Sequence, residues 1–168
     1  MTKQFALILV ILVVIGCEEG LQPPNGFEGT VRFPTNESGE VIWPDSLEAA
    51  VVAFADASKI NFQQISFTEV LDHLLGYSQP LDTAEEQQDY FLQALAGPDK
   101  VYIAGVVATR VPFKQIIATP IDSLGAHPEY FQIIGIHRKS KNNISFIYVD
   151  DEEITSGIDI EVNYDFTF

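Results

Sequence analysis

Cysteine is almost absent from this 168-residue chain, which has Cys17 alone. One thiol cannot form a disulfide within the chain, so the fold must depend on packing and not on cross-links. Cys17 follows Gly16 at the end of an apolar N-terminal segment, residues 5–15, where we expect the thiol to be taken up by a covalent modification. Thiol catalysis is therefore excluded.

Histidine is also scarce, and the residue patterns of catalysis are missing. His73, His127 and His137 lie far apart and form no paired spacing such as H-E-x-x-H. The serine patterns G-x-S-x-G and S-x-x-K do not occur. We interpret each histidine as a surface residue, because a lone histidine has no partner to set its role. The sequence predicts no catalytic residue, no metal site and no cofactor.

Basic residues are few. The chain has 9 Lys and Arg against 24 Asp and Glu, a net charge of −15, or −16 once residues 1–16 and their Lys3 are removed. This charge repels nucleic-acid phosphates and anionic lipid headgroups, so nucleic-acid binding is disfavoured. We interpret the excess acid as a solvated surface that keeps the domain soluble.

The apolar run at residues 5–15 is too short to cross a bilayer, which needs about 20 residues. Lys3 before the run and Gly16 after it are typical of a secretion signal. Two alternatives fit less well. An ordinary signal peptide would end in an A-x-A pattern, and a signal anchor would need a longer apolar run.

The four residues Val14, Ile15, Gly16 and Cys17 resemble the lipobox of bacterial lipoproteins. The resemblance implies that the signal is cut between Gly16 and Cys17 and that the Cys17 thiol carries a lipid. It also implies two or three acyl chains, which are enough for stable anchoring, whereas a single chain is marginal.

Three parts of the chain are predicted. Residues 1–16 form the signal peptide, and residues 17–25 form a polar, proline-containing tether behind the lipid. Residues 26–168 form one domain, which is long enough to bury a real core.

The domain is predicted to be mainly β. Strands are indicated by alternation of apolar and polar residues or by short apolar runs between turn residues. They are expected at residues 27–33, 47–56, 89–95, 100–109, 130–137, 144–149 and 158–168. One short helix is expected at residues 66–75, in the long connection 57–83. Ser66 and Glu69 suit a capping box there, and Gly76 suits a left-handed helix end.

About seven antiparallel strands with one short helix describe a single β-sandwich. The order of features resembles the transthyretin-like, carboxypeptidase-regulatory-like sandwiches of bacterial envelope lipoproteins. The resemblance is carried by the strand FEGTVRF, the W-P-D break before LEAAVVAFAD, the hairpin DYFLQALAGPDKVYIAGVVA and the ending ITSGIDIEVNYDF. It covers most of residues 26–168 and implies a binding or structural module.

Two further features could carry a site. Asp150, Asp151, Glu152 and Glu153 could offer oxygens to calcium, but they lack the spacing of an EF-hand loop, and a solvated turn is the favoured interpretation. Trp43 and the tyrosines could stack on a sugar, but aromatic residues of strands more often pack in the core.

We therefore expect a lipid-anchored, non-enzymatic cell-envelope module that binds a protein or glycan partner. The alternatives are a small hydrolase, which would need a cleft with paired carboxylates, and a carrier of a hydrophobic ligand, which would need a cavity between the sheets. Glu18 and Glu19 directly after Cys17 favour the outer membrane over the inner one. Neither residue distinguishes its periplasmic leaflet from the cell surface.

Overall fold

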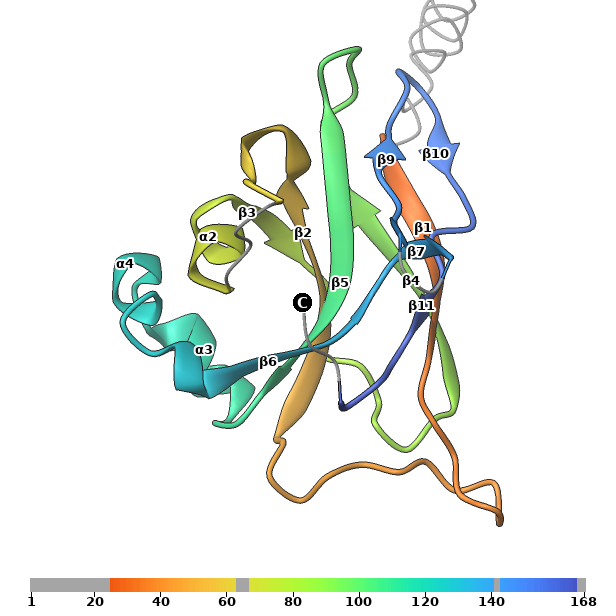
Figure 1. The fold of residues 1–168 in the computed structure, drawn as a ribbon, viewed down its shortest axis with the longest axis vertical. Coiled ribbons are helices and arrows are strands. Elements are labelled where there is room, and N and C mark those ends of the chain that lie inside the picture. Colours follow the sequence, from red (N-terminus) through yellow and green to blue (C-terminus); the bar gives the residue numbers. More distant parts are fainter. Residues whose placement is uncertain (1–24, 63–66, 141–142, 166–168) are drawn as a thin grey trace, which may run out of the picture.

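The computed structural model describes residues 25–62, 67–140 and 143–165, apart from the side chains of residues 67–69 and 121–122. Two β-sheets face each other in it (Figure 1). In sheet 1, strand β1 (Gly26–Arg32) pairs antiparallel with β4 (Gln87–Gln93). On its other side β1 pairs with two short parallel strands, β10 (Ile154–Thr155) and β11 (Ile160–Glu161).

Sheet 2 has the order β3-β2-β5-β6. Its strands are β3 (Leu74–Tyr77), β2 (Ala49–Asp56), β5 (Val101–Thr109) and β6 (Phe131–Ile136). Strand β9 (Ile147–Tyr148) pairs with the start of β5. A further small hairpin joins β7 (Arg138–Ser140) to β8 (Asn143–Ile144). The predicted mainly β, antiparallel sandwich is confirmed, with the parallel β1 pairs as an addition.

Aromatic rings fill the space between the two sheets. Phe27 of β1 is completely buried, and its ring meets Phe54 of β2 at 5.3 Å and Tyr90 of β4 at 6.4 Å, both edge to face. Phe54 in turn meets Tyr102 of β5 at 5.6 Å. Edge-to-face pairs of this kind stabilise a core beyond the area that they bury.

Three tyrosine hydroxyls donate hydrogen bonds to backbone carbonyls of the loops around this core. Tyr90 donates to the carbonyl of Ile158 at 2.6 Å and Tyr164 donates to the carbonyl of Ile42 at 2.6 Å, while Tyr102 donates to the carbonyl of Leu95. Burial raises the pKa of Tyr164 to about 12 and also raises the pKa of Tyr90 and Tyr102. All three hydroxyls are therefore protonated donors at neutral pH.

Short helices cover the outer face of sheet 2, the side away from sheet 1 (Figure 1). One group connects β2 to β3 and consists of the 3-10 turn η1 (Ala57–Lys59) and helix α2 (Phe67–Asp72). The other group connects β5 to β6 and consists of α3 (Phe113–Ala118), α4 (Ile121–Leu124) and the 3-10 turn η2 (Pro128–Tyr130). The sequence had predicted a helix in the first connection only.

The predicted helix 66–75 is shorter than expected. It ends at Asp72, and the chain turns back as strand β3, which pairs antiparallel with β2. A further helical turn would leave the N–H and C=O groups at the edge of β2 without partners. Strand β3 forms hydrogen bonds with those groups, so the extended conformation is the more stable one here. Gly76 lies within β3 and has no positive φ. Its missing side chain makes room for the Phe54 ring, which a Cβ would approach to 2.7 Å. Ser66, the expected cap, lies outside the described residues.

Candidate functional site: an apolar cavity beneath the helices

A cavity of about 200 Å³ lies between the outer face of sheet 2 and the short helices. We call it the sheet–helix cavity. Its floor is formed by the residues of β2 and β5 that alternate away from sheet 1. They are Val51, Ala53, Ala55, Ile103, Gly105, Val107 and Thr109.

The hollow arises where two small residues lie side by side. Ala53 of β2 is the direct partner of Gly105 of β5 in the sheet. Gly105 cannot be larger, because a Cβ would lie 2.7 Å from the carbonyl oxygen of Gly135 in β6. The close approach of β6 therefore requires a glycine at position 105. Because this glycine has no side chain, space remains above the centre of the floor.

The roof is held together by side chains from all three helices. Leu71 of α2, Ile116 of α3 and Leu124 of α4 form one buried apolar cluster. Tyr77 of edge strand β3 meets Phe113 of α3 edge to face at 5.9 Å, which ties the sheet edge to the roof. The cavity is therefore bounded by two connections that are far apart in the sequence.

The lining is apolar. None of the described side chains around the cavity is charged, and apart from one tyrosine and two threonines all of them are hydrocarbon side chains or glycine. An engineered cavity of about 150 Å³ with a lining of Leu, Ile and Phe stays dry and binds benzene or xenon. The cavity here is larger and partly open to solvent, and its apolar lining offers an apolar molecule a comparable surface.

One residue of the lining carries a buried polar atom that has no partner in the part of the chain described. Thr109, at the end of β5, is 1% exposed, and its hydroxyl has no hydrogen-bond partner among the described residues. The other lining threonine, Thr119, donates from its hydroxyl to the carbonyl of Gln115 at 2.8 Å. A buried hydroxyl without a partner is rare in folded proteins and costs stability.

We expect the substitution Thr109→Val to leave the fold unharmed or to stabilise it, by up to about 1–3 kcal/mol in the absence of a ligand. Valine has the same shape and also favours strands, and it removes the hydroxyl that lacks a partner. Urea unfolding of both chains measures the difference. A large loss of stability would mean that the hydroxyl has a structural partner.

The residues predicted as sites from sequence fall elsewhere. Gly16 and Cys17 lie outside the described residues. The acidic residues Asp150 to Glu153 form an exposed turn between β9 and β10, in which Glu152 has a φ of 63° and its N–H donates to Asn25 Oδ1 at 2.7 Å. Over the described ranges, no group of three or more His, Cys, Asp or Glu side chains could hold a metal ion.

The histidines stay apart from one another and from the cavity. His127 lies 3.0 Å from Glu129 Oε1 and stacks on the Tyr130 ring at 4.7 Å. The hydrogen bond from His127 lowers the pKa of the Glu129 carboxyl. His137 Nδ1 lies 2.8 Å from the carbonyl oxygen of Asp159. These contacts orient two of the histidines on the surface but create no reactive pair.

Trp43 is half-buried and packs against the core, and it does not form a sugar platform. Its ring meets Phe33 at 5.9 Å and Tyr164 at 6.2 Å, and its Nε1 donates to the carbonyl of Leu47 at 2.9 Å. The interpretation that this aromatic residue packs with the core is confirmed.

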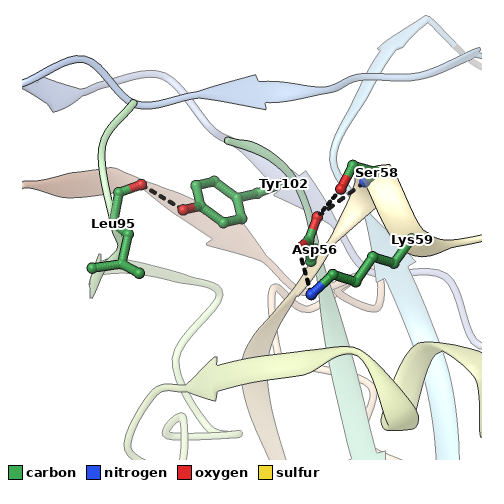
Figure 2. A network of polar contacts seen from close by, with 5 residues as sticks. All are labelled: Asp56, Ser58, Lys59, Leu95 and Tyr102. Carbon is green, nitrogen blue, oxygen red and sulfur yellow. Dashed lines mark hydrogen bonds and ion pairs between the residues drawn. The ribbon is translucent and has the colours of Figure 1, made fainter. Parts of the chain in front are cut away.

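The buried carboxylate Asp56 serves the fold (Figure 2). It accepts hydrogen bonds from the Ser58 hydroxyl at 2.6 Å and the Ser58 N–H at 3.1 Å, and it pairs with Lys59 Nζ at 3.2 Å. The hydrogen bond from the Ser58 hydroxyl, with help from Lys59, lowers the pKa of the Asp56 carboxyl. Asp56 thereby caps the turn η1 at the end of β2 and remains ionised.

Sequence reasoning missed the cavity because its residues are unremarkable one by one. The one available signal was the pair of small residues, Ala53 and Gly105, at the centres of two strongly apolar strands.

No helix in the described part of the chain is long and apolar enough to span a membrane. The chain matches none of the protein-family models, curated proteins or solved structures with which it was compared.

Proposed function

We propose that this chain is a lipid-anchored, non-enzymatic binding protein of the bacterial cell envelope that holds an apolar ligand in the sheet–helix cavity. The observation that carries the proposal is the cavity itself, about 200 Å³ in volume and lined by no charged side chain among the described residues. The ligand carrier was one of three functions considered from the sequence. Its cavity lies outside the sandwich and not between the sheets, where aromatic rings are packed.

An apolar ligand is favoured over a glycan, and binding is favoured over catalysis, for two reasons. The tryptophan singled out for stacking on a sugar, Trp43, packs instead against Phe33 and Tyr164. General acid–base catalysis needs titratable groups in the cleft, and the lining offers only Tyr77 as a titratable side chain among its described residues. Both points support a site that binds and does not react.

The anchor in this proposal comes from the sequence. Val14 to Cys17 resemble a lipobox, and the first strand begins at Gly26, nine residues after Cys17. A net charge of −16 after residue 16 keeps a tethered domain off an anionic membrane surface. Glu18 and Glu19 favour the outer membrane as its location.

The test uses the full chain in lipid nanodiscs and a photoreactive alkane that carries a diazirine. We expect label in the peptides that contain residues 49–56 and 101–109, and much less label there in the variant Ala53→Leu. Leucine would fill the centre of the floor and displace about two methylenes of ligand. At about 0.8 kcal/mol for each, the affinity should fall roughly tenfold.

The matched control is Ala84→Leu, the same change in an exposed turn outside the cavity, which should label like the unchanged chain. Label that is confined to the N-terminal lipid region, or equal cavity label in Ala53→Leu and Ala84→Leu, would contradict the proposal.

A further inference from the structure

The mouth of the sheet–helix cavity is bordered by exposed apolar side chains. Tyr77 of β3 and Ile117 of α3 both line the cavity, and they are 50% and 59% exposed. A residue that lines the cavity and is at least half exposed lies where the cavity meets the solvent. Phe113 connects the two, because its ring contacts Tyr77 and it precedes Ile117 by four residues, about one helical turn. We call these three residues the apolar rim.

The packing of the roof does not require an exposed isoleucine at this place. Ile116 is 8% exposed and joins the buried cluster of Leu71 and Leu124, so it already holds α3 to the other helices. Ile117, its neighbour on the helix, is turned by about 100° away from it and faces the solvent. Single exposed apolar residues are ordinary, but a contiguous group at the mouth of a cavity indicates a surface that binds something.

The two segments that supply the rim contain no acid. The chain has 24 Asp and Glu among 168 residues, one in seven, so the 21 residues of segments 73–81 and 110–121 would hold three on that average, and they hold none. Asp72 and Asp122 flank these segments in the sequence but do not belong to the lining of the cavity. An anionic surface therefore repels the other faces of the domain more strongly than this one.

Basic and aromatic residues at the rim also suit a lipid surface. Arg110 and Lys114 are the charged residues of the two segments, and both are exposed. Lys114 directly follows Phe113, so its hydrocarbon stem can lie along the rim while its ammonium group reaches a lipid phosphate. Tyrosine is enriched where proteins cross the boundary between membrane and water, and Tyr77 is the rim residue of this kind.

We propose that the apolar rim docks on the bilayer to which the chain is anchored, so that an apolar ligand passes between the membrane and the cavity without crossing water. Tyr77 and Ile117 then lie among the lipid headgroups, and Lys114 lies at their phosphates. This inference rests on the proposed function and names the lipid bilayer as the source or the destination of the ligand.

The tether is long enough for this orientation. Nine residues separate Cys17 from the start of β1, and they span at most about 30 Å when fully extended. The radius of gyration expected for a domain of this size is about 14 Å. The domain can therefore turn its cavity towards the membrane although the tether joins it at sheet 1.

The experiment measures the depth of a nitroxide label by electron paramagnetic resonance, with oxygen, which concentrates in the bilayer, and a nickel chelate, which stays in water. The full lipidated chain in nanodiscs of phosphatidylcholine and phosphatidylglycerol carries the label at Ile117→Cys or at Ala84→Cys. Ala84 lies in an exposed turn beside Glu85 and Glu86. Cys17 is occupied by lipid in the proposed function, so the introduced cysteine is the free thiol.

We expect oxygen to act more strongly than the chelate on the label at residue 117, and the reverse at residue 84. Lys114→Glu should give the label at residue 117 the profile of a label in water. Each basic residue near anionic lipid contributes about a fivefold preference, and this substitution reverses the charge. Lys100→Glu makes the same change in the exposed turn before β5 and should leave the label at residue 117 immersed.

The two proposals fail in different ways. A label at residue 117 that is as accessible to the chelate as the label at residue 84, or equal effects of Lys114→Glu and Lys100→Glu, would overturn the docking inference. Cavity labelling by the photoreactive alkane would still support the proposed function in that case. An immersed label at residue 117 in a chain whose cavity takes up no alkane would support docking and overturn the proposed function.

Discussion

Truncation of Phe27 to alanine is expected to lower the free energy of unfolding by about 3–5 kcal/mol. Phe27 has no exposed surface and joins sheet 1 to sheet 2 through its edge-to-face contacts with Tyr90 and Phe54. Removing the ring leaves a void that the flanking strands cannot close, because both are fixed by their neighbours in the sheets. Urea unfolding followed by the fluorescence of Trp43, the single tryptophan, measures the loss.

The matched control is Phe91→Ala. Phe91 belongs to β4 in the same sheet, but its ring lies on the outer face and is 41% exposed. It should cost much less, on the order of 1 kcal/mol. Equal losses for the two variants would mean that the space between the sheets is not the main core of the domain.

The substitution Leu71→Asp is expected to have the second largest effect, about 3 kcal/mol or more, because it places a charge without a partner in a packed contact. Leu71 is 8% exposed and packs with Ile116 and Leu124, so the charge would separate α2 from α3 and α4. The same variant should lose cavity labelling by the photoreactive alkane, since the roof comes apart.

Leu75→Asp provides the comparison, because Leu75 lies only four residues further on and is 53% exposed on edge strand β3. It should change the unfolding free energy by less than about 1 kcal/mol. If Leu71→Asp proved as mild as Leu75→Asp, the helices would not be packed as a roof.

The strands could be predicted from the sequence because alternation reports directly on burial. Phe27, Val31 and Phe33 recur at the spacing of one strand face, and all three lie in the core. The apolar run of β2 was correctly predicted as a strand buried on both faces, since one face meets sheet 1 and the other meets the helices.

The ends of the helices could not be predicted, because the sheet decides them. Leu74 and Leu75 continue the helical spacing of Leu71. They nevertheless belong to strand β3, which pairs with the open edge of β2. Helices α3 and α4 have six and four residues, too few for a clear period, and the only signals were Pro112 and Pro120 directly before them.

The cavity lies beyond sequence reasoning for another reason. It depends on Ala53 and Gly105 being direct partners across two strands, and on the register shift between Val106 and Val107 where β5 pairs with β6. Register is set by the whole sheet and is not visible in either strand alone. The unpaired hydroxyl of Thr109 is likewise visible only once its neighbours are in place.

Native mass spectrometry of the full chain, purified from the membranes of cells that make it, tests the central claim most directly. We expect the unchanged chain to carry a non-covalent, uncharged adduct, and we expect Ala53→Leu, purified in parallel, to have lost it, because leucine occupies its place. Equal adducts on the two chains, or an unchanged chain without any adduct, would contradict the account of the sheet–helix cavity as a ligand site.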